Sequence, residues 1–344
     1  MRKVEVYFKS NYWKIYPTLE EIAIKSIRRI SNGICLELIP LIKNFSHFLI
    51  STNGEEYKAL KDSLITVRFE GKEVERRKIK VKVVTKDGYT SRDYCVEVSY
   101  YPSSFYKRYG KSEPTWIIIH TSDLSLYLSK IEDWIVEEVN EEDKQFIERK
   151  WGHLVRQSKS DYEAACRIAK SLIDELESHR GVPSDYMEKL PPLEQYKSAM
   201  SGKGKVWCSN IASIFSYICN ALNIPCRKII LGHRVITNES GNVGVLIAED
   251  HTTTEIFSKD LNQWIWIDPT CYILGAYLED IGPLNLIETY MFVNNPARLK
   301  HLYVVEYDPL TRVERKVRVL ESVRKYAILN YLKRDQVFKY LRKY

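Results

Sequence analysis

Apolar and polar residues alternate along the N-terminal part of the chain, and this alternation restricts what the region can fold into. A period of two gives a β-strand one apolar and one polar face. The alternating apolar positions are Ile65, Val67, Phe69, Ile79, Val81, Val83, Val96, Val98 and Tyr100. Asn53-Gly54 and Asp87-Gly88 are turn signals beside these stretches. We therefore predict that residues 1–120 form a β-rich domain, an antiparallel sandwich with one polar surface.

Two segments in this half of the chain have a different pattern. Residues 18–30 fit a helix as well as a strand, because Thr18 and Glu21 form a capping box. Residues 121–158 have a helical pattern that is rich in acidic residues, which we interpret as a solvated face. We expect residues 121–158 to be a helical connector between two units.

From Ser160 onward the apolar residues follow helical spacing. Ser160 and Glu163 form a capping box. The first helical stripe contains Tyr162, Ala165, Ala169, Leu172, Ile173 and Leu176, and the second contains Ile211, Ile214, Phe215, Ile218, Cys219 and Leu222. Asn223 and Pro225 end the second helix, and strands are expected over residues 243–248, 251–257 and 263–267. This pattern predicts an α+β domain over residues 159–305.

The composition is that of a globular chain. Apolar residues make up 44% and charged residues 28%, which excludes a disordered or fibrous protein. Apolar runs such as residues 116–119 are too short for a membrane span, and charged residues between Lys9 and Glu21 interrupt any signal-peptide core. The seven cysteines form no C-x-x-C pair, so we expect free thiols and no zinc site. We expect a cytoplasmic protein with no cofactor or metal.

The positive charge is concentrated at the C-terminal end. The net charge is +7, and residues 311–344 contain eleven Lys or Arg against three Asp or Glu. Val337, Tyr340, Leu341 and Tyr344 recur at helical spacing, so we predict a basic, helical segment over residues 306–344. The segment is expected to be a helix docked on the body, and the alternative is a contact with nucleic acid, anionic lipid or an acidic partner.

Cys208 stands where the second helix begins, and this position suits a reactive thiol. The thiolate is the nucleophilic form of cysteine, and a free thiol with a pKa of about 8.5 is only slightly ionised at neutral pH. The N–H groups and the dipole at a helix N-terminus stabilise an adjacent anion. His251 begins a strand and Asp268 ends the next one. Two adjacent antiparallel strands would bring this carboxylate beside the imidazole, whose other nitrogen would then face the thiol.

These residues occur in a set of motifs that resembles a known family. The family's pattern is a Gly-rich turn, a Cys with Ala four residues later, a helix ending in G-I-P-A-R, a strand with His and Glu four apart, and a Trp four residues before the Asp of D-P-T. The matching residues are Gly204, Cys208, Ala212, Asn223 to Arg227 (N-I-P-C-R), Gly232, His251, Glu255, Trp264, Asp268, Pro269 and Thr270. The segment from Ser160 to about Thr270 therefore resembles the transglutaminase-like superfamily, a rearranged relative of the papain fold.

The resemblance implies a papain-like catalytic domain, with the Cys-bearing helix packed on an antiparallel sheet. It implies a cysteine protease, amidase or transamidase, a hydrolase or transferase in which Cys208 attacks an amide carbonyl of a peptide or protein. His251 would move the proton and Asp268 would orient the imidazole. The backbone N–H of Cys208 is one oxyanion donor, and Gln195 and Trp207 are alternatives for the second.

Two other readings stay open at the level of sequence. A non-catalytic binding or scaffold module would keep the same fold without turnover. Glu255 has three possible roles: it braces its strand, it supports the residues of the site from behind, or it is a simple surface carboxylate. Cys219 and Cys226 are expected to pack in the interior, whereas Cys271, which follows the D-P-T turn, is close in sequence to the site.

Overall fold

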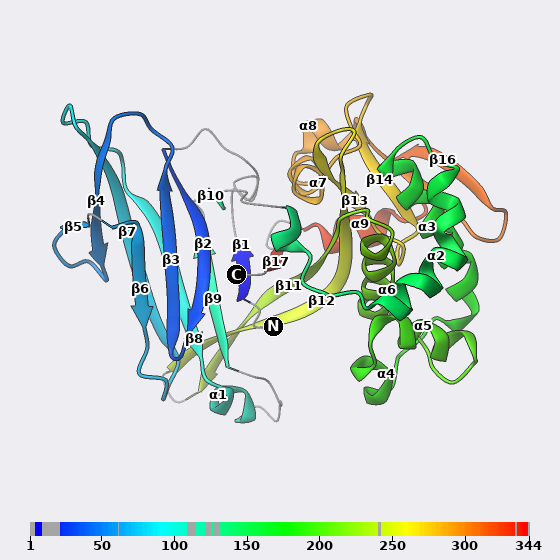
Figure 1. Ribbon diagram of the computed structural model, residues 1–344, viewed down its shortest axis with the longest axis horizontal. Coiled ribbons are helices and arrows are strands. Elements are labelled where there is room, and N and C mark those ends of the chain that lie inside the picture. The colour runs from blue at the N-terminus through cyan, green and yellow to red at the C-terminus, as the bar shows by residue number, and fades with distance from the viewer. Residues whose placement is uncertain are drawn as a thin grey trace. The chain divides into compact units, whose positions relative to one another are not determined.

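The computed structural model describes residues 4–8, 21–60, 62–108, 115–121, 125–126, 131–239, 242–333 and 336–342. The chain forms two compact units, drawn in Figure 1. Unit 1 consists of Met1–Trp134, Val235–Leu246 and Val337–Tyr344, and unit 2 consists of Ile135–Arg234 and Ile247–Gln336. Helices and strands both contribute to the chain, so the α+β class is confirmed at this level.

Unit 1 consists mainly of two β-sheets. One has the strand order β17-β1-β9-β8-β7-β4-β5 and the other the order β10-β2-β3-β6. The strands are β1 (Val4–Phe8), β2 (Ile22–Ile30), β3 (Gly33–Pro40), β4 (Phe45–Thr52), β5 (Lys58–Leu60), β6 (Leu64–Arg68), β7 (Glu75–Thr85), β8 (Tyr94–Tyr101), β9 (Trp116–Thr121), β10 (Ser125–Leu126) and β17 (Val337–Arg342). Two short helical segments, α1 (Ser103–Lys107) and η2 (Ile131–Trp134), complete this unit.

The alternation in the sequence explains these strands. On β7, Ile79, Val81 and Val83 are buried while the lysines between them are partly exposed. The possible helix over residues 18–30 is wrong where the structure describes it, since β2 pairs antiparallel with β3 from Ile22 to Ile30. Ile22 and Ile24 are fully buried there, because β-branched side chains pack well on a pleated surface. Thr18, the proposed cap, lies outside the described residues.

The C-terminal segment is a strand, which corrects the predicted terminal helix. β17 pairs antiparallel with β1, from Val4 with Arg342 to Phe8 with Phe338. Phe338 and Tyr340 are fully buried, and Lys339 lies over the ring of Trp116 at 3.9 Å. The sequence V-F-K-Y-L has high strand propensity, and a distant partner strand decides the outcome. The segment is docked on the body as expected, but through a β-ladder.

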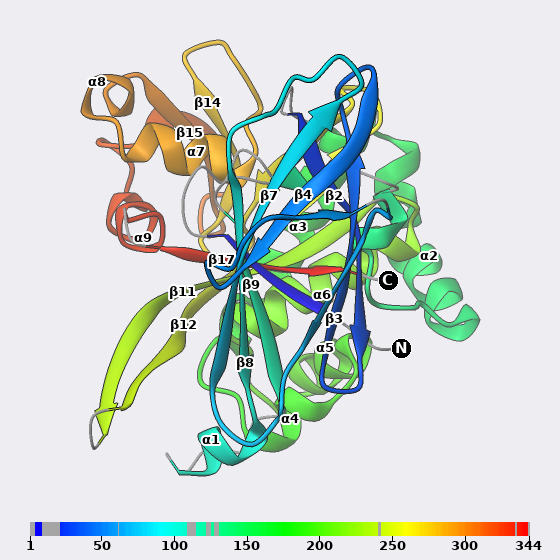
Figure 2. The same cartoon turned by 90° about the vertical axis from the view of Figure 1, so that its left-hand side faces the viewer.

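Unit 2 combines helices with two three-stranded groups. The helices are α2 (Glu141–Arg156), α3 (Asp161–Leu176), η3 (Glu177–His179), α4 (Asp185–Lys189), α5 (Pro192–Met200), α6 (Cys208–Ala221), α7 (Leu286–Val293), α8 (Pro296–Leu299) and α9 (Lys325–Tyr331). The strands are β11 (Cys226–Glu239), β12 (Asn242–Ser258), β13 (Gln263–Ile267), β14 (Ile273–Leu278), β15 (Leu302–Asp308) and β16 (Val313–Arg318). Their orders are β13-β12-β11 and β14-β15-β16, and Figure 2 shows the elements from a second direction.

The predicted helices of unit 2 are present with the expected ends. Ser160 caps α3 by accepting a hydrogen bond from the N–H of Glu163 at 3.1 Å. Asn223 has a φ of 61° just after α6, the left-handed conformation that ends a helix. The strands expected over residues 243–248 and 251–257 are one continuous strand, β12, and β13 has its predicted bounds.

The units are divided differently from the predicted domains. Residues 121–158 were expected to connect two units, but α2 buries Ile147 and Trp151 in the same core as α3 and α6. Residues 306–344 were expected to form a separate segment, but β15 starts at Leu302, and unit 2 continues to Gln336. A helix with one apolar stripe looks the same in sequence whether it bridges two units or covers one core.

No helix of the described residues combines the length and the apolar character needed to cross a bilayer.

Candidate active site

Cys208 is the first residue of α6, as the sequence predicted. Trp207 is the N-cap residue, and its N–H donates to Oδ1 of Asn210 at 3.2 Å, which fixes the start of the helix. The Cys208 side chain is partly exposed. The first N–H groups of a helix have no intrahelical acceptor, so they are available to an anion at this position.

The glycine loop before the helix has a packing role. A Cβ on Gly204 would lie 2.4 Å from the sulfur of Met187. The absence of a side chain at Gly204 thus leaves room for Met187 of α4 to pack closely against this loop.

His251 and Asp268 form a buried hydrogen-bonded pair. His251 lies on β12 and Asp268 directly follows β13, and the two strands are antiparallel neighbours with Thr254 opposite Ile267. Nε2 of His251 and Oδ2 of Asp268 are 2.6 Å apart, and the two residues are 4% and 1% exposed. The predicted meeting of the imidazole and the carboxylate is observed.

Further hydrogen bonds hold the Asp268 carboxylate. The backbone N–H of Cys271 donates to Oδ1 at 3.0 Å, within the turn that follows β13. The Thr253 hydroxyl also bonds the carboxylate and helps to lower its pKa. That hydroxyl in turn accepts a hydrogen bond from the Trp266 indole at 2.8 Å. Thr253 thus fixes the carboxylate from a second side.

The opposite charges of His251 and Asp268 stabilise each other. Burial lowers the pKa of His251, but the charge and hydrogen bond of Asp268, together with bonds to the Cys208 and Cys271 thiols, raise it well above its ordinary value. Burial raises the pKa of Asp268, yet the imidazolium and the Cys271 N–H leave it below its ordinary value. The geometry therefore favours a charged imidazolium beside a carboxylate at neutral pH.

The Cys208 thiol acts on this pair through the imidazole. Its interaction with the ring is one of the influences that raise the pKa of His251. Nε2 is bonded to Asp268, which leaves Nδ1 as the ring nitrogen that can exchange a proton with the thiol. The structure thus brings together all three residues that the sequence analysis selected.

Cys271 is a second thiol beside the imidazole. Its sulfur lies 3.8 Å from Nε2 of His251, and burial raises the pKa of the thiol to about 11. The donor atoms of His251, Asp268 and Cys271 lie within 4.8 Å of one another and could hold a metal ion. A metal ion would have to displace the 2.6 Å bond of the pair and the thiol proton, because ligating groups must be deprotonated.

Sequence reasoning missed Tyr331, which covers the imidazole. Tyr331 ends α9, and its ring stacks on that of His251 with centroids 4.2 Å apart and planes 10° from parallel. The cavity beside this stack has a volume of only about 10 Å³. The residues that line it are Leu231, His251, Thr253, Trp266, Asp268, Cys271, Ile273, Leu286, Ala327, Ile328, Tyr331 and Leu332. Since Tyr331 lies in no motif, its position follows only from the tertiary fold.

Glu255 braces the strand that carries the histidine. It is fully buried, and its Oε2 accepts from Nε and Nη2 of Arg227 at 2.9 and 2.6 Å. Its Oε1 accepts from the N–H of Leu286 at the start of α7 at 2.7 Å. The reading of Glu255 as a surface carboxylate is therefore wrong, and the bracing role is confirmed.

The two alternatives for a second oxyanion donor are engaged elsewhere. Nε2 of Gln195 donates to the carbonyl of Leu190 at 2.8 Å, and Oε1 accepts from Asn210 at 3.0 Å. The Trp207 indole donates to Oγ of Ser209 at 2.7 Å. Either side chain would have to exchange these bonds to serve as a donor to substrate.

Comparisons with known proteins give no family. No family model matches the chain, and no curated protein matches it. One solved structure with a partial similarity is a β-1,2-glucanase from Parabacteroides distasonis, at 11% identity and a TM-score of 0.16. The match covers 54% of this chain and 24% of the glucanase chain, and at this TM-score it supports no conclusion about fold or function.

Proposed function

We propose that this protein is a cysteine-dependent acyl-transfer enzyme of the transglutaminase-like type, acting on amide bonds in peptides or proteins. The proposal rests on one observation: a buried carboxylate holds an imidazole at 2.6 Å, and a thiol at a helix N-terminus contributes to the raised pKa of that ring. Thiol catalysis needs a nucleophile, a base within hydrogen-bond reach and a group that orients the base. Cys208, His251 and Asp268 have the chemistry for these three roles.

The reaction would proceed in two balanced steps. The Cys208 thiolate adds to the amide carbonyl, the imidazolium of His251 gives its proton to the departing amine, and a thioester remains on the sulfur. Water or an amine then adds to the thioester, gives a proton to His251 and releases the thiolate. The carbonyl oxygen, negative in each tetrahedral intermediate, would be stabilised by the backbone N–H groups at the start of α6. Cys208 is partly exposed whereas His251 is covered by Tyr331, so the carbonyl would approach from the thiol side.

Alkylation with iodoacetamide tests the reactive thiol. We expect Cys208 to be carbamidomethylated at about pH 6.5, well below the ordinary thiol pKa of about 8.5. Cys219 is an internal control, because burial raises the pKa of this thiol and the residue has no exposed surface. Peptide mass spectrometry at several pH values gives the rate at each cysteine.

A matched pair of histidine variants separates a true base from a general effect. His251→Ala should move the alkylation of Cys208 to higher pH, because the imidazolium partner is lost. His301→Ala, which removes a largely exposed histidine paired with Glu279, should leave the profile unchanged. Alkylation of Cys208 only above pH 8, with no response to His251→Ala, would contradict the proposal.

A non-catalytic binding module is the second candidate, and the small volume of the cavity beside the imidazole favours it. The space beside the imidazole is only about 10 Å³, and Gln195 and Trp207 are bonded to other groups. An activated ester such as p-nitrophenyl acetate distinguishes the two. An enzyme should release a burst of p-nitrophenol with a matching acetyl group on Cys208 in the intact mass, whereas a binding module should acylate at the rate of its Cys208→Ala variant.

A further inference from the structure

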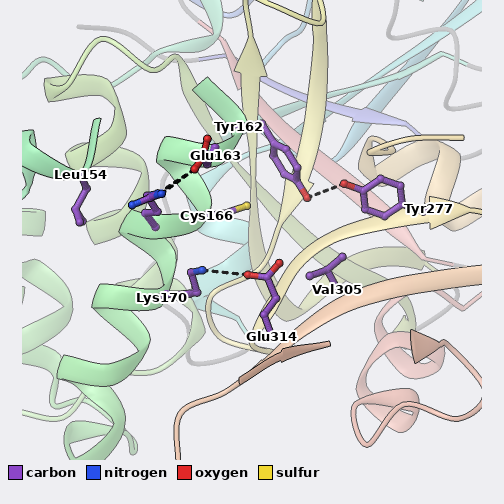
Figure 3. A pocket seen from close by; sticks show the side chains of 9 residues that line it. Leu154, Tyr162, Glu163, Cys166, Lys170, Tyr277, Val305 and Glu314 are labelled. Atoms are coloured by element: carbon purple, nitrogen blue, oxygen red, sulfur yellow. Dashed lines mark hydrogen bonds and ion pairs between the residues drawn. The ribbon is translucent and has the colours of Figure 1, made fainter. Parts of the chain in front are cut away.

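A second cavity of unit 2 contains none of the three candidate catalytic residues. Its volume is about 640 Å³, within the range of small-molecule sites, and Figure 3 shows it from close by. It is bounded by α3 on one side and by the β14-β15-β16 sheet on the other, with one residue from α2. The lining residues are Leu154, Tyr162, Glu163, Cys166, Arg167, Lys170, Tyr277, Val305 and Glu314.

The floor of the cavity is a directed chain of hydrogen bonds. The Tyr162 hydroxyl donates to the carbonyl of Leu274 at 3.0 Å, so its 3.2 Å bond with Tyr277 must take its proton from Tyr277 (Figure 3). The Cys166 thiol donates to the same carbonyl at 3.5 Å. Burial raises the pKa of both tyrosines and raises that of Cys166 to about 12, so all three groups stay protonated. The chain leaves the Tyr277 oxygen with lone pairs that can accept from a ligand.

The backbone is shaped to make this floor. The pairing of β14 with β15 shifts between Ile273 and Gly275, so Leu274 sits in a bulge and its carbonyl accepts from α3. A Cβ on Gly275 would lie 2.3 Å from the hydroxyl oxygen of Tyr162. The bulge and the glycine together admit the tyrosine hydroxyl against the sheet.

The charged residues around the cavity are balanced. Arg167 pairs with Glu163 at 2.8 Å along α3. Lys170 pairs with Glu314 at 3.0 Å between α3 and β16 (Figure 3). Two cations and two carboxylates give the lining no net charge. A ligand with a single charge can pair with lining groups of one sign only, whereas a zwitterion can pair with both kinds.

We propose that this cavity binds a short zwitterionic peptide with apolar side chains. The peptide carboxylate contacts Lys170 and Arg167, and the ammonium contacts Glu314 and the Tyr277 oxygen. Glu314 lines the same cavity as Tyr277 and Cys166. Leu154 and Val305 supply apolar surface for the side chains, and the volume fits a peptide of two or three residues better than a single amino acid. This site does not depend on the proposed acyl transfer.

Calorimetry with leucyl-leucine tests the site. The full-length Cys208→Ala variant is used, so that cleavage cannot consume the probe and the outcome does not depend on catalysis. We expect leucyl-leucine to bind, and we expect its cationic amide and its anionic N-acetyl derivative to bind about tenfold more weakly, since each loses one charge-assisted contact. Lys170→Met should weaken the binding of leucyl-leucine by a similar factor.

A second lysine in a comparable ion pair is the control. Lys197 pairs with Glu194 at 2.8 Å and has a similar exposure, but it does not line the cavity. Adding Lys197→Met to the Cys208→Ala variant should leave the affinity for leucyl-leucine unchanged. The proposal is overturned by a failure of leucyl-leucine to bind at millimolar concentration, by equal binding of the singly charged derivatives, or by equal losses in the Lys170 and Lys197 variants.

Discussion

Replacing Asp268 with Asn tests the charge pair at the centre of the candidate active site. Asp268 and His251 are buried and 2.6 Å apart, and the folded protein raises the pKa of the imidazole well above its ordinary value. The resulting stabilisation is complete below the unfolded pKa of about 6.5 and is lost as the pH rises through the folded pKa. One released proton corresponds to a loss of at most about 1.4 kcal/mol of unfolding free energy per pH unit.

The same linkage fixes the pH window of the experiment. The lowered pKa of Asp268 gives a stabilisation that is present above the unfolded value of about 3.9 and is lost only in acid, so it is constant near neutrality. The Cys271 thiol, with a pKa raised to about 11, makes folding less favourable only above the unfolded thiol pKa of about 8.5. Between about pH 6.5 and pH 8, His251 is therefore the dominant contribution of this site.

Urea unfolding at about pH 6, 7 and 8, followed by tryptophan fluorescence, measures the slope. We expect the unfolding free energy of the wild type to decrease across this range. The Asp268→Asn variant should show no such decrease, because a neutral amide does not stabilise a buried imidazolium. Asp280→Asn, which removes a fully exposed carboxylate, should keep the wild-type slope. A wild-type stability that is flat or rising, or equal slopes in wild type and Asp268→Asn, would refute the reasoning.

Three further substitutions follow from the described contacts. Arg227→Met leaves Glu255 buried without its cation and should cost about 3–5 kcal/mol in urea unfolding. Gly275→Ala brings a Cβ to 2.3 Å from the Tyr162 hydroxyl and should cost about 1–3 kcal/mol by the same measurement. Tyr331→Ala removes the ring stacked on the imidazole of His251. It should speed alkylation of the Cys208 thiol, measured by peptide mass spectrometry.

Each of these substitutions has a control in the same chain. Gly275→Ala should cost less in a Tyr162→Phe background, because the clashing oxygen is gone; an equal cost would place the strain elsewhere. Tyr326→Ala changes an exposed tyrosine of the same helix and should not alter alkylation. An Arg227→Met variant as stable as wild type would mean that the ion pair is not needed to hold β12.

The sequence predicted local elements well because their signals are local. The capping pair Ser160 and Glu163 and the terminator Asn223 each act within a few residues, and each is found in its predicted role. The meeting of His251 and Asp268 also followed, because antiparallel pairing of neighbouring strands is the common outcome. The role of Glu255 could not be predicted from the sequence, because its burial depends on contacts with Arg227 and with the start of α7.

Features that depend on distant partners were not predictable in this way. Tyr331 covers the imidazole from a helix that carries no motif. Residues 337–342 satisfy both a helical and a strand pattern, and their partner is at the other end of the chain. Two of the four unit boundaries fall within β11 and β12, two long strands that belong to both units, so no break in composition marks them.

The pairing of β1 with β17 has a consequence for how the chain is made. Phe8 pairs with Phe338, which follows it in the sequence by 330 residues. In its sheet, β1 lies between β17 and β9. On the ribosome, β1 must wait with one side of its backbone unpaired until more than 300 further residues have been made. Residues 135–234 and 247–333 are all synthesised before β17. Translation thus delivers β17 after every other strand of its sheet.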